Sequence, residues 1–260
     1  MAHLLANAVR NSFNTKVAYT DVSSLNPFVH EWRLRVKILR KFVRCFGNHN
    51  TVDLILVDEK GQKIHAVIDG DYIDRVCRRI TVGDWISLRG FKLTLAFYPF
   101  RPVPHRFMLR WQDTTVMKKI SPVSSNNFFS FASFDDVNSG ILDPAVCVDL
   151  IGEIIKVGNP KEDGGPNNDW NEIYFQLQDK TDNILQCRLP KDYANDFFNK
   201  WRHCTDDILI CIMRFAKLEV NSGSWLATSA YTCTEIMINF PCQEVTDMKH
   251  AVLTRECMQR

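Results

Sequence analysis

Hydrophobic and polar side chains alternate along most of the chain, which is the pattern of β-strands that bury one face. In residues 32–38, hydrophobic side chains alternate with arginine and lysine. Two runs rich in β-branched residues flank a Lys60-Gly61-Gln62 turn and predict a hairpin. Five strands are predicted in this half of the chain, at residues 32–38, 52–59, 63–68, 85–97 and 105–111. A short helical segment within 69–80 separates the third strand from the fourth.

The second half of the chain repeats this order of elements. The segment LILVDEKGQKIHAVI (54–68) aligns with YFQLQDKTDNILQCRL (174–189). Strands are predicted at residues 146–159, 172–183, 184–189 and, around an Asn221-Ser222-Gly223 turn, twice within 207–238, with an amphipathic helix at 191–201. Five strands with a helix between the third and the fourth are typical of the OB-fold, a small Greek-key barrel. The predicted fold is therefore mainly β, with two tandem OB-fold barrels.

The pattern also divides the chain into segments. The predicted boundaries are an N-terminal extension (1–20), a first barrel (21–120), a linker (121–143), a second barrel (144–240) and a C-terminal tail (241–260) that is irregular or briefly helical. The linker is rich in Ser and Asn but contains Phe128, Phe129, Phe131 and Phe134, whereas pure spacers lack aromatic residues. We therefore expect the linker to dock along the first barrel or onto its partner.

Composition excludes several classes of protein. With 45% hydrophobic and 24% charged residues, the chain is not intrinsically disordered. No apolar run approaches the roughly 18 residues of a membrane span, and the first residues do not form a secretory signal. The nine cysteines include no CxxC pair and no His/Cys cluster at zinc spacing. These features predict an intracellular protein with free thiols, no membrane association, and no metal or cofactor.

Charge is distributed unevenly between the two halves. Residues 1–120 carry 20 Lys and Arg against 10 Asp and Glu, a net charge of +10, whereas residues 121–260 carry 12 against 20, a net charge of −8. A basic half suits a polyanionic partner. Because the second half is acidic, the protein as a whole does not have a single, uniformly basic surface for nucleic acid. No GxSxG, phosphate-loop, HExxH or paired-carboxylate pattern is present, so the sequence predicts no enzymatic activity.

Several motifs together resemble a known family. The segment VSSLNPFVHEWRLRVKI (22–38) resembles the start of the first DNA-binding barrel of the replication protein A large subunit. The segments WRLRVKILRKF (32–42), LILVDEKGQKIHAVI (54–68) and HRFMLRWQDTTV (105–116) resemble plant proteins of the replication protein A-like first OB-fold family. In the second half, FDDV (134–137), VDLIGEIIKVGN (148–159) and IMRFAKL (212–218) are similar to the family's second barrel. The resemblance covers residues 20–240.

The chain departs from this family at aromatic positions that would stack on bases. Phe107 corresponds to the family's last-strand phenylalanine, but the aromatic expected after the third strand falls on Asp69. In the second barrel the expected tryptophan falls on Pro190, and the hairpin aromatic falls near Asn221, with Trp225 close by. The third barrel of the family's large subunit, with its cysteine zinc site, has no counterpart in these residues.

Single-stranded nucleic acid is held by cations along the phosphates and by aromatic faces that stack on bases. An OB-fold presents such groups on its second and third strands and on the loops after its first and fourth. The candidate residues are Arg40, Lys41, Arg44, Phe46, Lys63, His65, Phe97, Tyr98, Arg101, Arg106, Phe107, Arg110, Trp170, Lys191 and Lys217. Core packing is an alternative to stacking for Trp111, and a hydrogen-bonded position at the surface is the alternative to base contact for His65.

The sequence thus predicts a nuclear, sequence-tolerant single-stranded-DNA-binding protein, with the first barrel as the principal binder and no catalytic residue. The resemblance implies a role in replication, repair or recombination and protein partners of the replication protein A type. RNA is an alternative ligand, because stacking platforms accept both nucleic acids. The alternative function is a protein-interaction scaffold, since the OB-fold serves unrelated functions.

Overall fold

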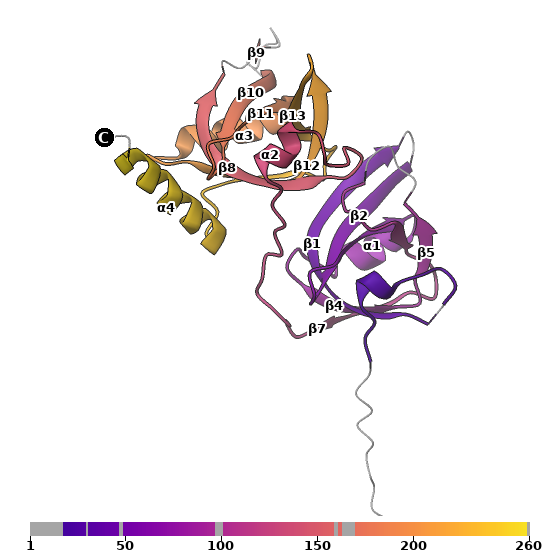
Figure 1. Ribbon diagram of the computed structural model, residues 1–260. Coiled ribbons are helices and arrows are strands. Elements are labelled where there is room, and N and C mark those ends of the chain that lie inside the picture. Colours follow the sequence, from indigo (N-terminus) through magenta and orange to yellow (C-terminus); the bar gives the residue numbers. More distant parts are fainter. Residues whose placement is uncertain are drawn as a thin grey trace, which may run out of the picture.

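Two curled β-sheets joined by an extended connector make up most of the chain (Figure 1). The structure is a computed structural model that describes residues 18–29, 31–46, 49–96, 101–158, 161–162 and 170–258. Within this described part, none of the helices combines the length and the apolar character needed to cross a membrane.

The first sheet has seven strands in the order β5-β6-β3-β2-β1-β4-β7. These strands are β1 (Arg33–Phe46), β2 (His49–Asp58), β3 (Lys63–Asp69), β4 (Trp85–Arg89), β5 (Lys92–Leu95), β6 (Phe107–Arg110) and β7 (Val116–Ile120). β4 and β5 lie far apart in this order but follow each other directly in the chain. The sheet therefore curls into an open half-barrel, which we call the first barrel, and the predicted strand 85–97 is a pair of strands with a corner between them.

Gly90 forms this corner. Its φ of +70° lies in the left-handed region, and a Cβ at this position would lie 2.2 Å from the Thr114 carbonyl oxygen. The Gly90 carbonyl accepts hydrogen bonds from the Gln112 side-chain amide at 2.9 Å and the Thr114 hydroxyl at 2.7 Å. The turn after β6 is thereby fastened to the corner at which the barrel bends.

The interior of the first barrel follows the sequence pattern. Leu34, Val36 and Ile38 of β1 are fully buried and alternate with basic residues, as a strand with one buried face requires. The short helix α1 (Tyr72–Cys77) packs against this core and the 3-10 turn η1 (Val22–Ser24) adds Val22 to it. The Lys41 ammonium group donates to the carbonyls of Cys77 and Ile80. Lys41 therefore caps the end of α1.

The second sheet closes completely. Its strands are β8 (Val148–Val157), β9 (Lys161–Glu162), β10 (Trp170–Gln178), β11 (Ile184–Pro190), β12 (Ile210–Asn221), β13 (Ser224–Ser229) and β14 (Glu235–Ile238). β8, β10, β11, β13 and β12 pair in a ring, while β9 and β14 lie outside it. The parallel β11–β13 pair repeats the parallel β3–β6 pair of the first barrel. The tandem OB-fold prediction is therefore confirmed.

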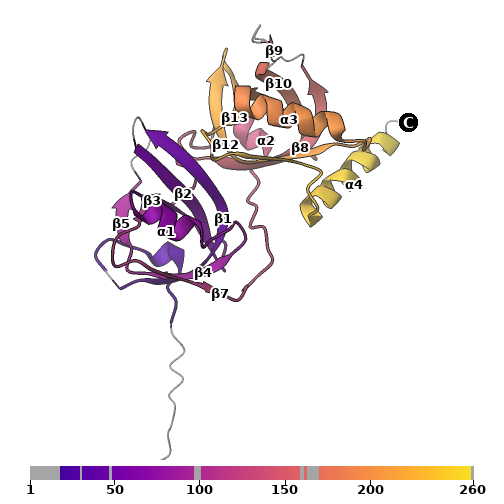
Figure 2. The ribbon, with the colours of Figure 1, turned by 180° about the vertical axis from the view of Figure 1, so that it is seen from behind.

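Two helices fill this second barrel. α3 (Lys191–His203) lies between β11 and β12 in the chain (Figure 2). It contributes Ala194 and Phe197 to the core, as its amphipathic pattern predicts. α2 (Phe134–Asn138) begins after Ser133, whose hydroxyl accepts from the Asp136 N–H at 3.1 Å. Phe134 and Val137 of α2 join the same core, although the sequence places them in the linker.

The connector docks on both barrels. The Lys37 ammonium group donates to the Asn126 carbonyl at 2.6 Å, and the Trp85 indole donates to the Ser124 carbonyl at 3.0 Å. On the other side, Arg214 donates to the Asn127 carbonyl at 2.6 Å, with its guanidinium 4.8 Å from the ring centre of Phe129. The phenylalanines of this segment therefore hold it against both barrels.

The C-terminal tail differs from its prediction. Residues 243–258 form α4 (Gln243–Met258), which lies along the outside of the second barrel (Figure 1). Val245, Met248 and Val252 share one face of this helix and are buried against β12. Their i, i+3, i+7 spacing was available in the sequence, but the tail's low overall amphipathicity concealed it. β7, β9 and β14 are the described strands that the strand pattern missed.

Replacing Met248 by Ala tests how firmly α4 is docked. Met248 is fully buried, so truncation removes its packing and leaves a cavity that costs about 2–5 kcal/mol. Leu253 is 51% exposed on the same helix, so Leu253→Ala is the matched control and leaves the free energy of unfolding nearly unchanged. Urea denaturation of both variants measures the difference. Equal midpoints would contradict the docking of α4.

Replacing Gly90 by Ala tests the corner of the first barrel. The added methyl group meets the Thr114 carbonyl, and the left-handed backbone disfavours any side chain, so we expect destabilisation of more than about 1 kcal/mol. Gly83→Ala is the control, because Gly83 has φ +96° with nothing within 4 Å of the added Cβ. Thermal unfolding should show a larger loss at position 90. An equal loss would mean that backbone strain alone matters.

Candidate nucleic-acid interface

The outer face of the first barrel is covered by the second. On β1 and β2 the outward side chains Leu39, Phe42, Ile55 and Val57 are buried. They pack with residues of the second barrel in one apolar cluster, which we call the inter-barrel contact. Its members from the second barrel are Cys147, Phe215, Ala230 and Cys233, and Phe128 of the connector packs at its edge. The strand surface expected to receive nucleic acid is thus largely a protein contact.

A buried ionic cluster lies beside this contact. The Asp53 carboxylate, which is fully buried, lies 2.7 Å from His65 Nε2 and 3.0 Å from the Arg44 guanidinium. Thr51 donates to the same carboxylate at 2.7 Å. His65 is 2% exposed and stacks on Phe42, with ring centroids 6.4 Å apart. The expectation of a hydrogen-bonded surface position for His65 is therefore corrected: the ring is hydrogen-bonded, but it is buried.

Arg40 ties the two barrels together. Its guanidinium donates to the carbonyls of Thr232, Cys233 and Thr234 at 3.4, 3.0 and 3.2 Å. The Thr232 hydroxyl in turn donates to the Val43 carbonyl of β1. The turn between β13 and β14 is therefore held by side-chain and backbone groups of the first barrel.

A groove opens where this turn, the end of β1 and the start of α3 meet. It has a volume of about 820 Å³, and we call it the inter-barrel groove. The first barrel contributes Arg40 and Arg44, whereas the second contributes Lys191 and Lys217. These four residues were candidates from the sequence, in separate halves of the chain. The tertiary structure brings them into one site.

Tyr231 supplies an aromatic face to this groove. Its side chain is 61% exposed and its φ is +45°, a conformation in which a bulky residue is a genuine outlier. Strained backbone of this kind persists only where surrounding contacts enforce it, and it occurs often at functional sites. The contacts from Arg40 and Thr232 provide that enforcement. Sequence reasoning missed Tyr231 because it divided 207–238 into two strands, whereas the structure has a turn at Tyr231 between β13 and β14.

The charges of the groove are partly balanced. The Lys217 ammonium group lies 2.7 Å from Glu219, and Arg40 lies 3.8 Å from Glu235. Asp192 and Asp196 line the groove together with exposed Lys191. Burial raises the pKa of Tyr193 to about 12, so its hydroxyl is a neutral donor, here to the Thr234 carbonyl at 3.0 Å. An anionic ligand would bind here by displacing carboxylates from the cations.

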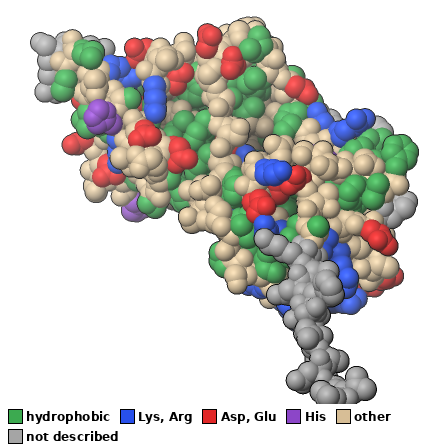
Figure 3. Space-filling view, turned by 60° about the horizontal axis from the view of Figure 1, so that its bottom comes forward, with side chains coloured by type: hydrophobic (Ala, Val, Ile, Leu, Met, Phe, Trp, Pro, Cys, Tyr) green, Lys and Arg blue, Asp and Glu red, His purple; other side chains and the backbone are tan. Residues whose placement is uncertain are grey.

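The other basic candidates lie outside the groove. Arg110 pairs with Asp69 at 2.8 Å, and Arg101 pairs with Asp143 at 3.4 Å. Arg106 is exposed, with its guanidinium 5.2 Å from the ring centre of Phe107. On the face shown in Figure 3, lysine and arginine side chains are interspersed with aspartate and glutamate. On that face, the net positive charge of the first half does not collect in one patch.

The aromatic candidates of the first barrel are buried where the structure describes them. Phe107 is 8% exposed and Trp111 is 6% exposed, so neither offers an open face to a base. Trp111, which directly follows β6, packs with Leu109 in the core of the first barrel, whereas Phe107 lies beside the His105 ring and the Arg106 guanidinium. Phe97 and Tyr98 lie outside the described residues, as do the side chains of Phe46 and Trp170. The expectation that the first barrel is the principal binder has no support from the rings that are described.

No metal site emerges from the described residues, among which no three His, Cys, Asp or Glu side chains lie together as ligands would. The described cysteines are free thiols. Burial raises the pKa of Cys147 and Cys211 to about 12, so both remain protonated parts of the core.

Comparison with known proteins supports the architecture. Residues 23–140, slightly under half of the chain, match the model of the domain of unknown function DUF223. A chain of a replication protein A heterotrimer bound to ssDNA matches with a TM-score of 0.56 and 14% identity, covering 89% of this chain and 54% of that chain. The present chain thus spans about half the length of that structure. No curated protein sequence shows significant similarity.

Two further solved structures cover more of their own length. A murine DNA-binding protein bound with double-stranded DNA matches with a TM-score of 0.45 and 10% identity, over 79% of this chain and 94% of that chain. The p204 HINb domain matches with a TM-score of 0.44 and 9% identity, over 80% and 97%. At such identities, the replication protein A match shows the fold: the chain is a tandem OB-fold protein, similar in architecture to replication protein A.

Proposed function

We propose that this chain binds single-stranded nucleic acid in the inter-barrel groove. One observation carries the proposal: four cationic side chains from two barrels, of which Arg44 is paired with Asp53, line one groove with Tyr231, an exposed aromatic ring in a strained backbone conformation. Cations along phosphates and a ring beneath a base are the two elements of sequence-tolerant single-strand binding. A duplex offers no exposed base face to such a ring.

The finer assignment rests on resemblance. Single-stranded DNA is the proposed ligand, because the sequence motifs resemble the replication protein A family and the matching solved structure is described as bound to ssDNA. We propose a nuclear role in replication, repair or recombination, without catalysis, and with protein partners of the replication protein A type.

Protein binding is the second candidate function, and one feature of the groove favours it. Asp192 and Asp196 line the same groove as Lys191, so a partner with both signs of charge would find complements. The two candidates differ in their response to salt and to ring removal, which the following experiments measure.

Binding should be measured by fluorescence anisotropy on labelled oligo-dT, with matched RNA and duplex, at low and moderate salt. We expect binding to single strands that weakens as salt rises, because neutralised phosphates release counterions. Stronger binding to duplex than to single strands, or no binding at micromolar protein in low salt, would reject the proposal.

Replacing Tyr231 by Ala should remove one stacked base. Such stacking contributes about 1–3 kcal/mol, so affinity for oligo-dT should fall about 5- to 150-fold. Tyr231→Phe keeps the ring and should keep the affinity. Phe28→Ala is the matched control, because Phe28 is 89% exposed and does not line the groove. Equal affinities of the Tyr231→Ala and Phe28→Ala variants would place the ligand elsewhere.

Removing two groove lysines should change the salt dependence. Each phosphate contact on a single strand contributes about 0.7 to the slope of log affinity against log salt, so Lys191→Ala with Lys217→Ala should reduce the slope by about 1.4. Lys92→Ala with Lys118→Ala is the control, since both side chains are exposed on the first barrel outside the groove. If both double variants have the wild-type slope, the groove does not bind phosphates.

A further inference from the structure

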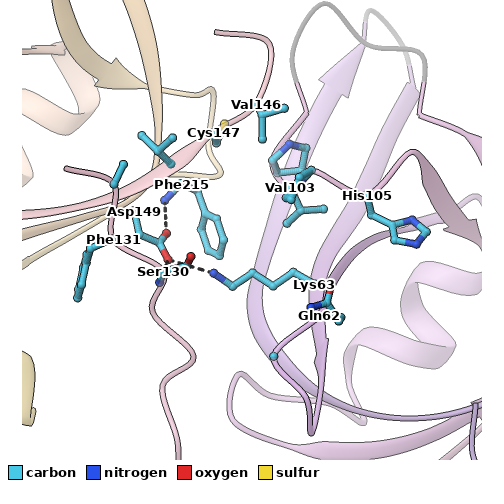
Figure 4. A pocket seen from close by; sticks show the side chains of 15 residues that line it. Gln62, Lys63, Val103, His105, Ser130, Phe131, Val146, Cys147, Asp149 and Phe215 are labelled. Carbon is cyan, nitrogen blue, oxygen red and sulfur yellow. Dashed lines mark hydrogen bonds and ion pairs between the residues drawn. The ribbon is translucent and has the colours of Figure 1, made fainter. Parts of the chain in front are cut away.

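The two barrels are joined a second time, at a cleft that is separate from the inter-barrel groove. A cleft of about 530 Å³ separates the start of β3 and residues 102–105 from the connector and the start of β8 (Figure 4). The Lys63 side chain extends across this cleft, and its ammonium group lies 3.1 Å from the Asp149 carboxylate. The side chains are 11% and 3% exposed, so this is a largely buried ion pair between barrels.

The Asp149 carboxylate binds groups from three separate segments of the chain. Besides Lys63, it accepts the backbone N–H of Ser130 and of Phe215, each at 3.1 Å. Phe215 has φ +54° and lies at an irregularity of β12, while Ser130 belongs to the connector. The charge of Arg214 also acts on Asp149. Within this arrangement, Lys63 is the group from the first barrel, so its removal detaches that barrel from the carboxylate.

The inter-barrel groove exists only while the barrels are docked. Arg40 and Arg44 come from the first barrel, and Lys191, Lys217 and Tyr231 from the second. The Tyr231 turn is also held by Arg40. Lys63 lines the opposite cleft and does not line the groove. A ligand in the groove therefore binds the docked arrangement and has no equivalent site when the barrels separate.

We propose that the Lys63–Asp149 pair is a latch that keeps the barrels docked and thereby couples barrel docking to nucleic-acid binding. The coupling rests on the proposed function of the groove. A ligand that binds one of two arrangements shifts the population toward it, and the reverse effect is equal in size. Lys63 is then a positioning residue that acts at a distance and does not touch a phosphate.

The latch is tested with Lys63→Ala in the full chain. We expect faster hydrogen exchange in the segment 230–234 and a larger radius of gyration in solution X-ray scattering. Oligo-dT affinity should fall about 5-fold or more, which is the usual size of such coupling. The slope of log affinity against log salt should keep its wild-type value. Lys63→Arg restores the ion pair and should restore all three measurements, and Lys92→Ala is the control that changes none.

The outcomes separate the latch from its alternatives. A slope reduced by about 0.7 with unchanged hydrogen exchange would make Lys63 a direct phosphate contact and overturn the latch. Unchanged exchange, scattering and affinity would also overturn it. If the wild-type chain does not bind oligo-dT, the proposed function fails, yet exchange and scattering still decide whether Lys63 holds the barrels. Lys63→Met keeps the aliphatic stem and serves if the alanine variant does not fold.

Discussion

The burial of the outer face of β1 and β2 beneath the second barrel is the constraint on which the rest of the structure depends. Leu39, Phe42, Ile55 and Val57 are too apolar to face water as one patch, and the second barrel covers them. This contact fixes how the barrels stand relative to each other. It also removes from solvent the outer face of β2, one of the two strands by which an OB-fold ordinarily meets its ligand.

Buried charged groups at this contact lie in ion pairs, as burial demands. Asp53 lies between Arg44 and His65, and Asp149 accepts from Lys63 and two backbone N–H groups. Several of the predicted phosphate contacts are therefore structural ion pairs. What remains accessible is the groove at the rim, which Arg40, Lys191 and Lys217 line together with the exposed ring of Tyr231 and the carboxylates of Asp192 and Asp196. The proposed binding site therefore lies at the junction between the two barrels and not on the face of one barrel.

The connector shows why the junction is well defined. A flexible spacer would let the barrels move independently, but this segment is fixed by Lys37 and Trp85 on one side and by Arg214 on the other. Its phenylalanines add apolar contacts to both barrels. The chain therefore specifies one mutual arrangement of the barrels through three independent means: the apolar contact, the latch and the docked connector.

The sequence by itself determined the local features: strand alternation, the repeated order of elements, the helix at Lys191–His203, and the docking of an aromatic linker, because these depend on the period of nearby residues. It also named all four cations of the groove. Only the tertiary structure decided which side of each strand is open. Periodicity assigns Phe42 and Ile55 to one face of a strand, but it cannot tell whether that face meets water or another domain, since that depends on contacts with residues far along the chain, such as Phe215. For the same reason Tyr231 became visible as a site residue only after Arg40, from the other barrel, was seen to hold its turn.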